Sequence, residues 1–358
     1  MIGYYCTTSY HLMVILMIAI NNEKKRKQIL FISPHFKNKE KVIYALEKTG
    51  LFEAVVLLND YYGSKKYKLV RKYRKVCFFG EAKKFCHNYS FSEFIFFPGS
   101  LIFASYFVKY IRRKSPDCSF AFGEDGLASY IRHAEYCLPN KRMKYFLKLM
   151  GGENNLRLYK TMYVMQPDLV VNEGNFLLKK IVRTDEIISK FNKLIENIFG
   201  MEKIPRSDIL FLQQPFKSDL SSMNLLENLQ DQALKYLSGQ IPRLSAYIKI
   251  HPRTLNLDSF PKNLKLIEST GLFEASVTPQ INNVLLITVC STAAISPYMM
   301  WGYTPPICFL YKIDGGFSFS KNLQTFLEKF KGEYQKRGGI VYEPQSWNNF
   351  IKILETIN

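Results

Sequence analysis

The sequence predicts an α/β protein made of two Rossmann-like domains, each with a parallel sheet. Short apolar runs typical of buried strands alternate with longer helical segments, which is the pattern of parallel βαβ units. The alternation is interrupted at 200–207, where Pro205 and a loss of periodicity indicate a linker. The 358 residues, 47% of them hydrophobic, can fill two cores. We therefore expect domains at 1–203 and 204–358, whose parallel sheets face an interdomain cleft.

The series before the linker alternates strands and helices. Its strands are short apolar runs, and its helices are longer segments with apolar residues at helical spacing. We expect strands at 2–6, 28–32, 52–58, 92–97 and 118–123, with further strand material at 159–171. We expect helices at 10–21, 38–49, 101–113 and 177–198, the third of them after a break at Pro98-Gly99-Ser100.

The series after the linker repeats this alternation. We expect its strands at 209–213, 246–250, 264–268, 284–290 and 306–310. We expect its helices at 220–238, from an Ala-rich start near Ala293, and at 347–357. Functional groups in open α/β sheets lie where strands end and helices begin, so the residues after each strand are the candidates for chemistry.

The charge of the chain is strongly positive. Lys and Arg number 49 against 30 Asp and Glu, a net charge of +19. Much of the excess lies in four clusters of the N-terminal half, at 24–27, 65–75, 112–114 and 141–148. Such a surface attracts polyanions, but no nucleic-acid module is recognisable. We therefore expect contact with an anionic membrane surface rather than with nucleic acid, and plain solubility is the alternative.

Cysteine usage and hydropathy limit the location of the protein. The seven cysteines are spread widely and form no CxxC pair, so neither a zinc site nor a disulfide framework is indicated, and a reducing cytoplasm fits best. The apolar stretch 1–20 lacks a basic start and is interrupted by Thr7-Thr8-Ser9. No run reaches the ~18 apolar residues of a membrane span. We expect a cytoplasmic protein, peripheral at the inner face of the cell membrane.

Glu124-Asp125-Gly126 is the first candidate for chemistry. The two acids directly follow the expected strand 118–123, and Gly126 permits a tight turn or the close approach of a ligand. A carboxylate at this position can accept the proton of an attacking hydroxyl. The alternative is an ordinary Asp-Gly turn with solvated acids.

His251-Pro252-Arg253 is the second candidate, after the expected strand 246–250. Proline stiffens the chain beside the imidazole, and a histidine next to an arginine suits a phosphate that must leave as an anion. The alternative is a loop histidine that only bonds to the backbone. An acid from one domain and an imidazole from the other would suit a group transfer.

Ser291-Thr292 is the third candidate, between the expected strand 284–290 and the helix near Ala293. Hydroxyls and free backbone N–H groups at a helix N-terminus can bind an anion. A helix cap without a ligand is an equally good interpretation.

Two further groups of residues follow from position alone. Thr7-Thr8-Ser9 and His11 come after the first strand, where they either bind an acceptor or cap the helix. Glu274 is a candidate for binding ribose hydroxyls, and Glu268 is its rival.

Some motifs of nucleotide enzymes are absent from the sequence. It has no Walker A pattern, and no GxGxxG follows the first strand, so ATPase and dinucleotide functions lose support. It also lacks an isolated DxD between apolar residues, the metal-binding motif of many sugar-nucleotide enzymes. We therefore expect a mechanism that needs neither metal nor cofactor.

Taken in this order, the three motifs resemble those of the bacterial sialyltransferases. Those families share an acidic pair followed by Gly, then His-Pro, then a Ser-Ser or Ser-Thr pair. The opening residues 4–12 are similar to the start of glycosyltransferase family 52, which includes lipooligosaccharide and capsular-polysaccharide sialyltransferases. The strand and loop at 209–215 are similar to that family's entry into its second domain.

The resemblance implies a GT-B fold and an inverting, metal-independent transfer of sialic acid from CMP-sialic acid. The acceptor, bound by the first domain, would be a terminal sugar, galactose by expectation, of a cell-surface polysaccharide or lipooligosaccharide precursor. The resemblance implies that Glu124 is the general base, with Asp125 as the fallback. It implies that His251 stabilises or protonates the leaving phosphate, and that Ser291 and Thr292 bind this phosphate. Glu274 would bind the ribose. A homodimer is also implied. The alternatives are a GT-B enzyme with a UDP-hexose donor and a non-catalytic polyanion-binding protein.

Overall fold

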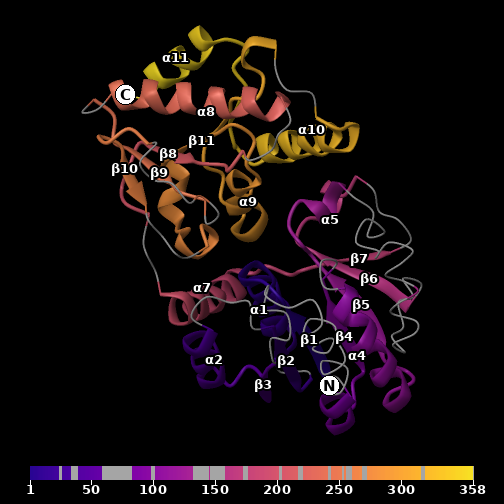
Figure 1. Cartoon of the computed structure of the whole chain (residues 1–358). Coiled ribbons are helices and arrows are strands. Elements are labelled where there is room, and N and C mark those ends of the chain that lie inside the picture. Colours follow the sequence, from indigo (N-terminus) through magenta and orange to yellow (C-terminus); the bar gives the residue numbers. More distant parts are fainter. Residues whose placement is uncertain are drawn as a thin grey trace, which may run out of the picture. The chain divides into compact units, whose positions relative to one another are not determined.

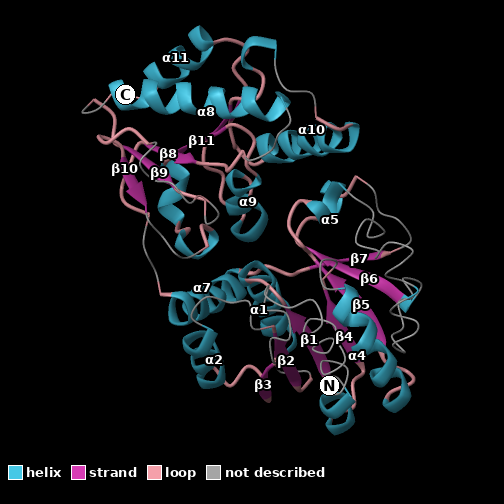
Figure 2. Cartoon of the chain, in the orientation of Figure 1, coloured by secondary structure: helices cyan, strands magenta, loops and turns pink. Residues whose placement is uncertain are grey.

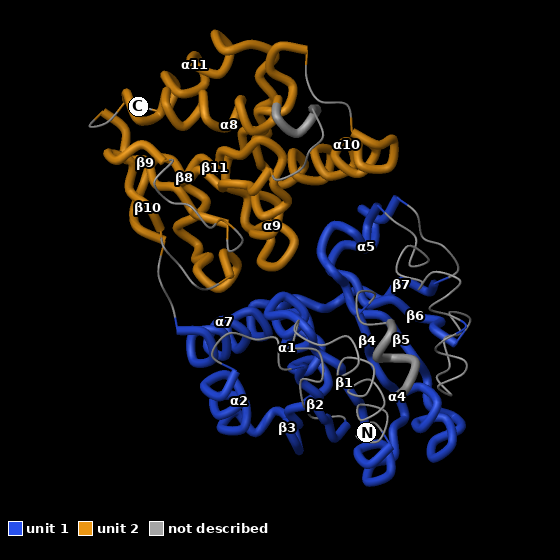
Figure 3. Tube along the Cα trace, in the orientation of Figure 1, with its two compact units in different colours: residues 1–200 blue, residues 201–358 orange. Residues whose placement is uncertain are grey.

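The computed structural model describes two compact units, Met1–Gly200 and Met201–Asn358 (Figure 3). The described residues are 1–23, 26–33, 39–58, 83–97, 101–131, 145, 158–171, 176–200, 204–216, 221–240, 243–251, 254, 260–267, 272–315 and 319–357. Pro252, Arg253 and Glu268 lie outside them. Of the four basic clusters, only Arg112-Arg113-Lys114 is fully described.

The first unit is built on a seven-stranded parallel sheet (Figures 1 and 2). Its order is β3-β2-β1-β4-β5-β6-β7. The strands are β1 Ile2–Cys6, β2 Gln28–Ile32, β3 Ala54–Leu57, β4 Glu93–Phe96, β5 Ser119–Gly123, β6 Tyr159–Val164 and β7 Leu177–Lys180. The strands β1, β2 and β4 are buried along their whole length, which explains their uninterrupted apolar sequences.

The helices of the first unit are α1 Ser9–Asn22, α2 Lys39–Lys48, α4 Leu101–Lys114, α5 Ala128–Ile131 and α7 Asp185–Phe199. Thr8 caps α1 by accepting a hydrogen bond from the backbone N–H of His11, and the following apolar stretch is buried. Both α1 and α2 pack against α7, which Thr184 caps and which ends at Gly200 with a φ of 70°.

The second unit is built on a six-stranded parallel sheet of order β10-β9-β8-β11-β12-β13. The strands are β8 Ile209–Leu212, β9 Ala246–Lys249, β10 Lys265–Ile267, β11 Leu285–Thr288, β12 Ile307–Phe309 and β13 Val341–Tyr342. The helices are α8 Ser221–Gly239, α9 Ser296–Trp301, α10 Lys321–Lys336 and α11 Trp347–Glu355. A buried core joins α8 and α11 to the sheet through residues such as Leu237, Phe350 and Phe211.

Both sheets have the strand order of a Rossmann fold. The order reverses between β1 and β4 in the first unit and between β8 and β11 in the second. Ligands of open α/β sheets bind at the carboxyl ends of the strands next to such a reversal. The predicted class, α/β with two Rossmann-like parallel sheets, is confirmed.

Several predicted elements differ from the structure. The expected helix 177–198 is wrong at its start, because 177–180 form the edge strand β7 and the helix begins at Asp185. The strand at 159–171 ends at Val164, since Pro167 has no N–H for the ladder and starts a 3₁₀ turn. The helix near Ala293 is a 3₁₀ turn, Thr292–Ala294, followed by the six-residue α9. Helix α10 and strand β13 were not predicted.

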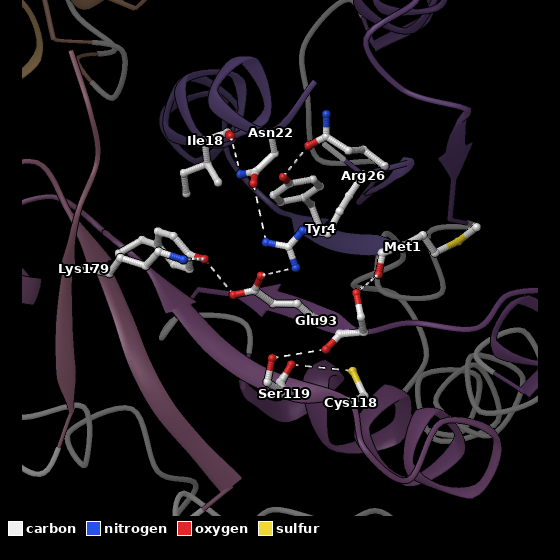
Figure 4. Close-up of polar contacts among 12 residues, drawn as sticks. Met1, Tyr4, Ile18, Asn22, Arg26, Glu93, Cys118, Ser119 and Lys179 are labelled. Atoms are coloured by element: carbon white, nitrogen blue, oxygen red, sulfur yellow. Dashed lines mark hydrogen bonds and ion pairs between the residues drawn. The ribbon is translucent and has the colours of Figure 1, made fainter. Parts of the chain in front are cut away.

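An ion pair between a buried glutamate and a partly exposed arginine links elements of the first sheet (Figure 4). Glu93, only 7% exposed, lies 3.1 Å from Arg26 Nη1 and accepts a 2.6 Å hydrogen bond from the hydroxyl of Tyr163. Lys179 donates in turn to the Tyr163 oxygen at 2.9 Å. The carboxylate therefore holds β4, β6 and the turn before β2 together.

We expect Glu93→Ala to lower the free energy of unfolding by about 2 kcal/mol, because it leaves the Tyr163 hydroxyl without its acceptor and removes the charge partner of Arg26. Urea denaturation measures the change. Glu53→Ala is the matched control, since Glu53 pairs with Lys27 at the exposed surface and its loss should cost about 0.5 kcal/mol. Equal midpoints for the two variants would contradict the prediction.

Candidate functional site

The acidic pair of the first unit follows β5 directly. Glycine is required on both sides of it, for different reasons. A Cβ on Gly123 would lie 2.6 Å from the ring of Phe97, and Gly126 has a φ of 61°. The two glycines allow the strand to pass close under an aromatic ring and then to turn sharply, which fixes the positions of Glu124 and Asp125.

Glu124 is almost completely buried, with 1% of its surface exposed. Its Oε1 accepts a 2.7 Å hydrogen bond from the hydroxyl of Tyr10, and its Oε2 accepts from the hydroxyl of Tyr130 at 2.5 Å and from the N–H of Met165 at 2.8 Å. Burial raises the pKa of Glu124, although these hydrogen bonds and the charge of Arg183 oppose the shift. The site thus contains a fixed carboxylate that takes up a proton more readily than an ordinary glutamate.

Asp125 is held by a buried histidine. Its Oδ1 lies 2.8 Å from His11 Nε2, and its own side chain is 29% exposed. The other ring nitrogen, Nδ1, lies 2.9 Å from Thr7 Oγ1. A neutral imidazole that donates a hydrogen bond from Nε2 to the carboxylate can accept one from the threonine hydroxyl at Nδ1. The hydrogen-bond series Thr7–His11–Asp125 is therefore chemically consistent. His11 also stacks on Phe97, with ring centroids 4.0 Å apart.

The structure therefore brings together residues that were predicted separately, namely Thr7, His11, Glu124 and Asp125. Thr8 caps α1, so for this residue the capping interpretation holds. Ser9 is the first residue of the same helix. Sequence reasoning missed the partners Tyr10 and Tyr130, because hydroxyls far apart in the chain meet at Glu124 only through the fold.

In the second unit, His251 lies just beyond the end of β9. Its backbone N–H donates to Gln213 Oε1 at 3.0 Å, and the same oxygen accepts from the hydroxyl of Thr254 at 2.7 Å. Gln213 is 7% exposed. The turn at His251 is therefore fixed by an amide that follows the neighbouring strand β8.

The turn at Ser291 is held by Gln214, the residue that follows Gln213. Gln214 Oε1 accepts the N–H of Cys290 at 2.9 Å, and the N–H of Ser291 donates to Thr288 Oγ1 at 3.0 Å. The hydroxyl of Ser291 accepts from the N–H of Ala293, which is a capping contact. The hydroxyl can still donate its own proton to an anion.

Thr292, next to this cap, is exposed. The helix expected near Ala293 is only a 3₁₀ turn followed by the six residues of α9, so little helix dipole is present behind Ser291. The predicted anion site at this turn would therefore depend on its hydroxyls and N–H groups.

Glu274 lies in the segment between β10 and β11, at the start of a 3₁₀ turn, Glu274–Ser276. Burial raises the pKa of its carboxyl group, and a hydrogen bond with Ser296 and the charge of Lys249 oppose this effect. Lys249 is the last residue of β9, two residues before His251, so Glu274 belongs to the same end of the sheet.

The consecutive amides Gln213 and Gln214 bond to the turns that carry the candidate residues, and sequence reasoning did not assign them. Gln214 is itself fixed by Gln230 of α8, whose side chain bonds to both its N–H and its carbonyl. The available signal was two amides directly after an apolar strand. Strands β9, β8 and β11 are neighbours, so these amides connect the His251 turn to the Ser291 turn.

Neither a metal nor a membrane-spanning element is indicated by the described part of the chain. Its residues include no group of three or more His, Cys, Asp or Glu that could hold a metal ion. None of its helices is both long and apolar enough to cross a membrane.

The profile of the Alpha-2,8-polysialyltransferase (POLYST) family matches residues 4–304, well over half of the chain. The chain belongs to this family. The match supports the predicted sialyltransferase and, more broadly, a glycosyltransferase. It does not address glycosyltransferase family 52, so that assignment stays a prediction. No curated protein matches the chain.

Three solved structures are similar to this polysialyltransferase-family chain at low identity. A UGT transferase from Siraitia grosvenorii in complex with UDP has 10% identity and a TM-score of 0.43, with 100% of both chains covered. LpCGTa in complex with UDP has 11% identity and a TM-score of 0.49, covering 96% of this chain and 85% of that one. A UDP-glucosyltransferase from Polygonum tinctorium has 8% identity and a TM-score of 0.48, covering 90% of this chain and 81% of that one. The family match alone carries the assignment.

Proposed function

We propose that this polysialyltransferase-family protein is an inverting, metal-independent sialyltransferase of GT-B type that uses CMP-sialic acid. The family match over residues 4–304 carries the proposal. The family name describes enzymes that form α2,8 links between sialic acids, so we place a sialic acid at the end of the acceptor glycan in preference to galactose. Residues 1–200 contain 33 Lys and Arg against 17 Asp and Glu, an excess of 16 positive charges that suits an acidic cell-surface glycan.

The second unit is suited to hold the donor. When CMP leaves, its phosphate gains negative charge, which His251 stabilises or protonates and the hydroxyls of Ser291 and Thr292 bind. Glu274 accepts hydrogen bonds from the ribose. Arg253, in the predicted sequence motif, adds positive charge to this group. This assignment rests on the placement of His251, Ser291 and Glu274 at one end of the same sheet.

The first unit supplies the base. The acceptor oxygen attacks the anomeric carbon of the sialyl group as the bond from that carbon to the phosphate oxygen breaks, which inverts the configuration. Glu124 is the proton acceptor, because burial raises its pKa while Asp125 is engaged with His11. The acceptor proton passes to the hydroxyl of Tyr10, which is only partly buried, as the Tyr10 proton moves to Glu124 Oε1.

Nucleotide release tests the proposed donor. The purified protein, a sialylated oligosaccharide acceptor and either CMP-sialic acid or a UDP-hexose are incubated, and the released nucleotide is measured. We expect CMP to be released, at the same rate with and without EDTA. Release of UDP would favour a UDP-hexose enzyme, and no release from any donor would favour the non-catalytic polyanion-binding protein.

Gln213→Ala tests the connection between the two turns of the second unit. The variant leaves the N–H of His251 and the hydroxyl of Thr254 without their acceptor, so we expect kcat/KM for the donor to fall about tenfold. Steady-state kinetics at saturating acceptor measures the effect. Gln335→Ala, at an exposed position of α10, is the matched control. Equal kinetics in the two variants would contradict the role of Gln213.

A further inference from the structure

A cavity of ≈ 410 Å³ lies in the second unit, at residues that have no role in the proposed chemistry. Tyr311 and Lys312 follow β12, Glu343 follows β13, and Lys331 lies on α10, so the cavity is at the carboxyl end of the sheet. The lining residues are Tyr311, Lys312, Gly315, Phe319, Gln324, Leu327, Glu328, Lys331, Glu343 and Gln345.

The cavity lining includes a carboxylate that pairs with two ammonium groups. Glu343, 9% exposed, lies 3.0 Å from Lys312 Nζ and also bonds to Lys331 and to the hydroxyl of Tyr311. Burial raises the pKa of Glu343, but its bonds to Lys331, Tyr311 and Lys312 outweigh burial and hold the pKa below the usual value. Glu343 is thus ionised at neutral pH, and the two ammonium groups exceed it by one positive charge, which the exposed Glu328 balances over the lining as a whole.

Both lysines retain hydrogen-bonding capacity. An ammonium group has three donors, and within the described part of the chain each lysine directs one of them to Glu343. Their side chains are 37% and 30% exposed, so the remaining donors are accessible to a ligand. An anionic group can therefore bind to both lysines without displacing Glu343.

The rest of the lining has the composition of a carbohydrate site. The rings of Tyr311 and Phe319, with centroids 4.7 Å apart, form an apolar wall together with Leu327. Gln324 and Gln345 offer amides, and the exposed Glu328 offers a carboxylate for hydroxyl groups. A polyhydroxylated ligand with one acidic group and one small apolar group could bond to the lysines, the amides and Glu328 and pack against the apolar wall.

The backbone at this cavity is strained. Asp314 has a φ of 53°, the single positive φ of a non-glycine residue among those described. Its N–H donates to the carbonyl of Gln345, and its neighbour Gly315 lines the cavity. Non-glycine residues in this conformation cluster at ligand sites.

The cavity is next to the Ser291 turn. The N–H of Tyr311 donates to the carbonyl of Val289 at 3.2 Å, and Val289 lies two residues before Ser291. The proposed phosphate site at Ser291 and the cavity therefore lie at the ends of the neighbouring strands β11 and β12.

We propose that this cavity binds the carboxylate-bearing sugar of the reaction, with the sugar carboxylate on Lys312 and Lys331. The inference rests on the proposed sialyltransferase function. Sialic acid has the required groups, namely a carboxylate, a row of hydroxyls and an N-acetyl methyl. It is present in two substrates, the donor and the sialylated acceptor, and the experiment distinguishes them.

The test uses the double variant Lys312→Gln/Lys331→Gln in the full chain. Hydrolysis of CMP-sialic acid without acceptor gives KM for the donor, and transfer at saturating donor gives KM for the acceptor. We expect one of these two constants to rise about tenfold or more while kcat changes less. A rise in the first identifies the sialyl group of the donor, and a rise in the second identifies the acceptor. If both constants stay within about twofold of wild type, the inference is wrong.

Two further variants separate ligand binding from structure. Lys336→Gln, on the same helix but 71% exposed and paired with Glu333, is the matched control and should not change either constant. Glu343→Gln removes the internal negative charge, so the affected KM should stay the same or fall. If Glu343→Gln instead raises KM as the lysine variants do, the cluster is only structural and the proposal fails.

A binding measurement keeps this inference distinct from the proposed function. Free N-acetylneuraminic acid is titrated into wild type and the double variant, and saturation-transfer NMR records the bound ligand. If wild type binds the free sugar but never releases CMP, and the double variant does not bind the sugar, the cavity proposal is supported and the sialyltransferase function is wrong. Equal signals from both proteins would overturn the cavity proposal.

Discussion

Replacing Glu124 with glutamine should lower the rate of sialic acid transfer by about a hundredfold or more. Glutamine keeps the size of the side chain but cannot take up the proton that the acceptor loses. Because burial raises the pKa of Glu124, the wild-type rate should also fall on the acid side at a pH above the ordinary pKa of a glutamate, and this limb of the pH profile should disappear in Glu124→Gln. Steady-state transfer over a range of pH measures both effects.

Two neighbouring substitutions test the route of the proton. Tyr10→Phe removes the hydroxyl that donates to Glu124 Oε1, so a loss similar to that of Glu124→Gln is expected. Asp125→Asn changes the contact with His11 and should cost less. If Asp125→Asn abolishes transfer while Glu124→Gln remains active, the base is Asp125.

Replacing His251 with alanine should also lower transfer by about a hundredfold or more, because the leaving phosphate loses the group that stabilises or protonates it. The same loss should be seen in hydrolysis of CMP-sialic acid without acceptor, since both reactions break the same bond. Glu124→Gln should affect hydrolysis less, and this difference separates the two roles.

The control for this variant is His87→Ala, at an exposed histidine of the first unit. Added imidazole should restore part of the activity of His251→Ala and none of that of Glu124→Gln. Undiminished transfer in both His251→Ala and Glu124→Gln would exclude the proposed mechanism.

The sequence predicted the strands of both sheets well where burial is complete. Strands such as β1 and β2 are apolar along their whole length because both faces of a parallel sheet are covered. The edge strand β7 has only one partly buried residue among exposed ones, so its sequence merges with that of the following helix. Strand β13 has two residues, too few for any periodic pattern.

The sequence predicted which residues form the candidate site but not which other residues they contact. Residues directly after strands could be assigned to the carboxyl ends of the sheets, which placed Glu124, His251 and Ser291 at the ends of β5, β9 and β11. Partners such as Tyr130, or Gln214 beside Cys290, come from other elements. Their positions depend on strand order and register, which local patterns do not contain.

The two adjacent amides after β8 have a thermodynamic consequence. Gln213 bonds to the turn of His251, Gln214 bonds to the turn of Ser291, and Gln213 Nε2 donates to the carbonyl of Gln214. In the proposed function, a nucleotide phosphate bound at the Ser291 turn would therefore also restrict the backbone at His251, so that part of the entropic cost of ordering the two turns is incurred together.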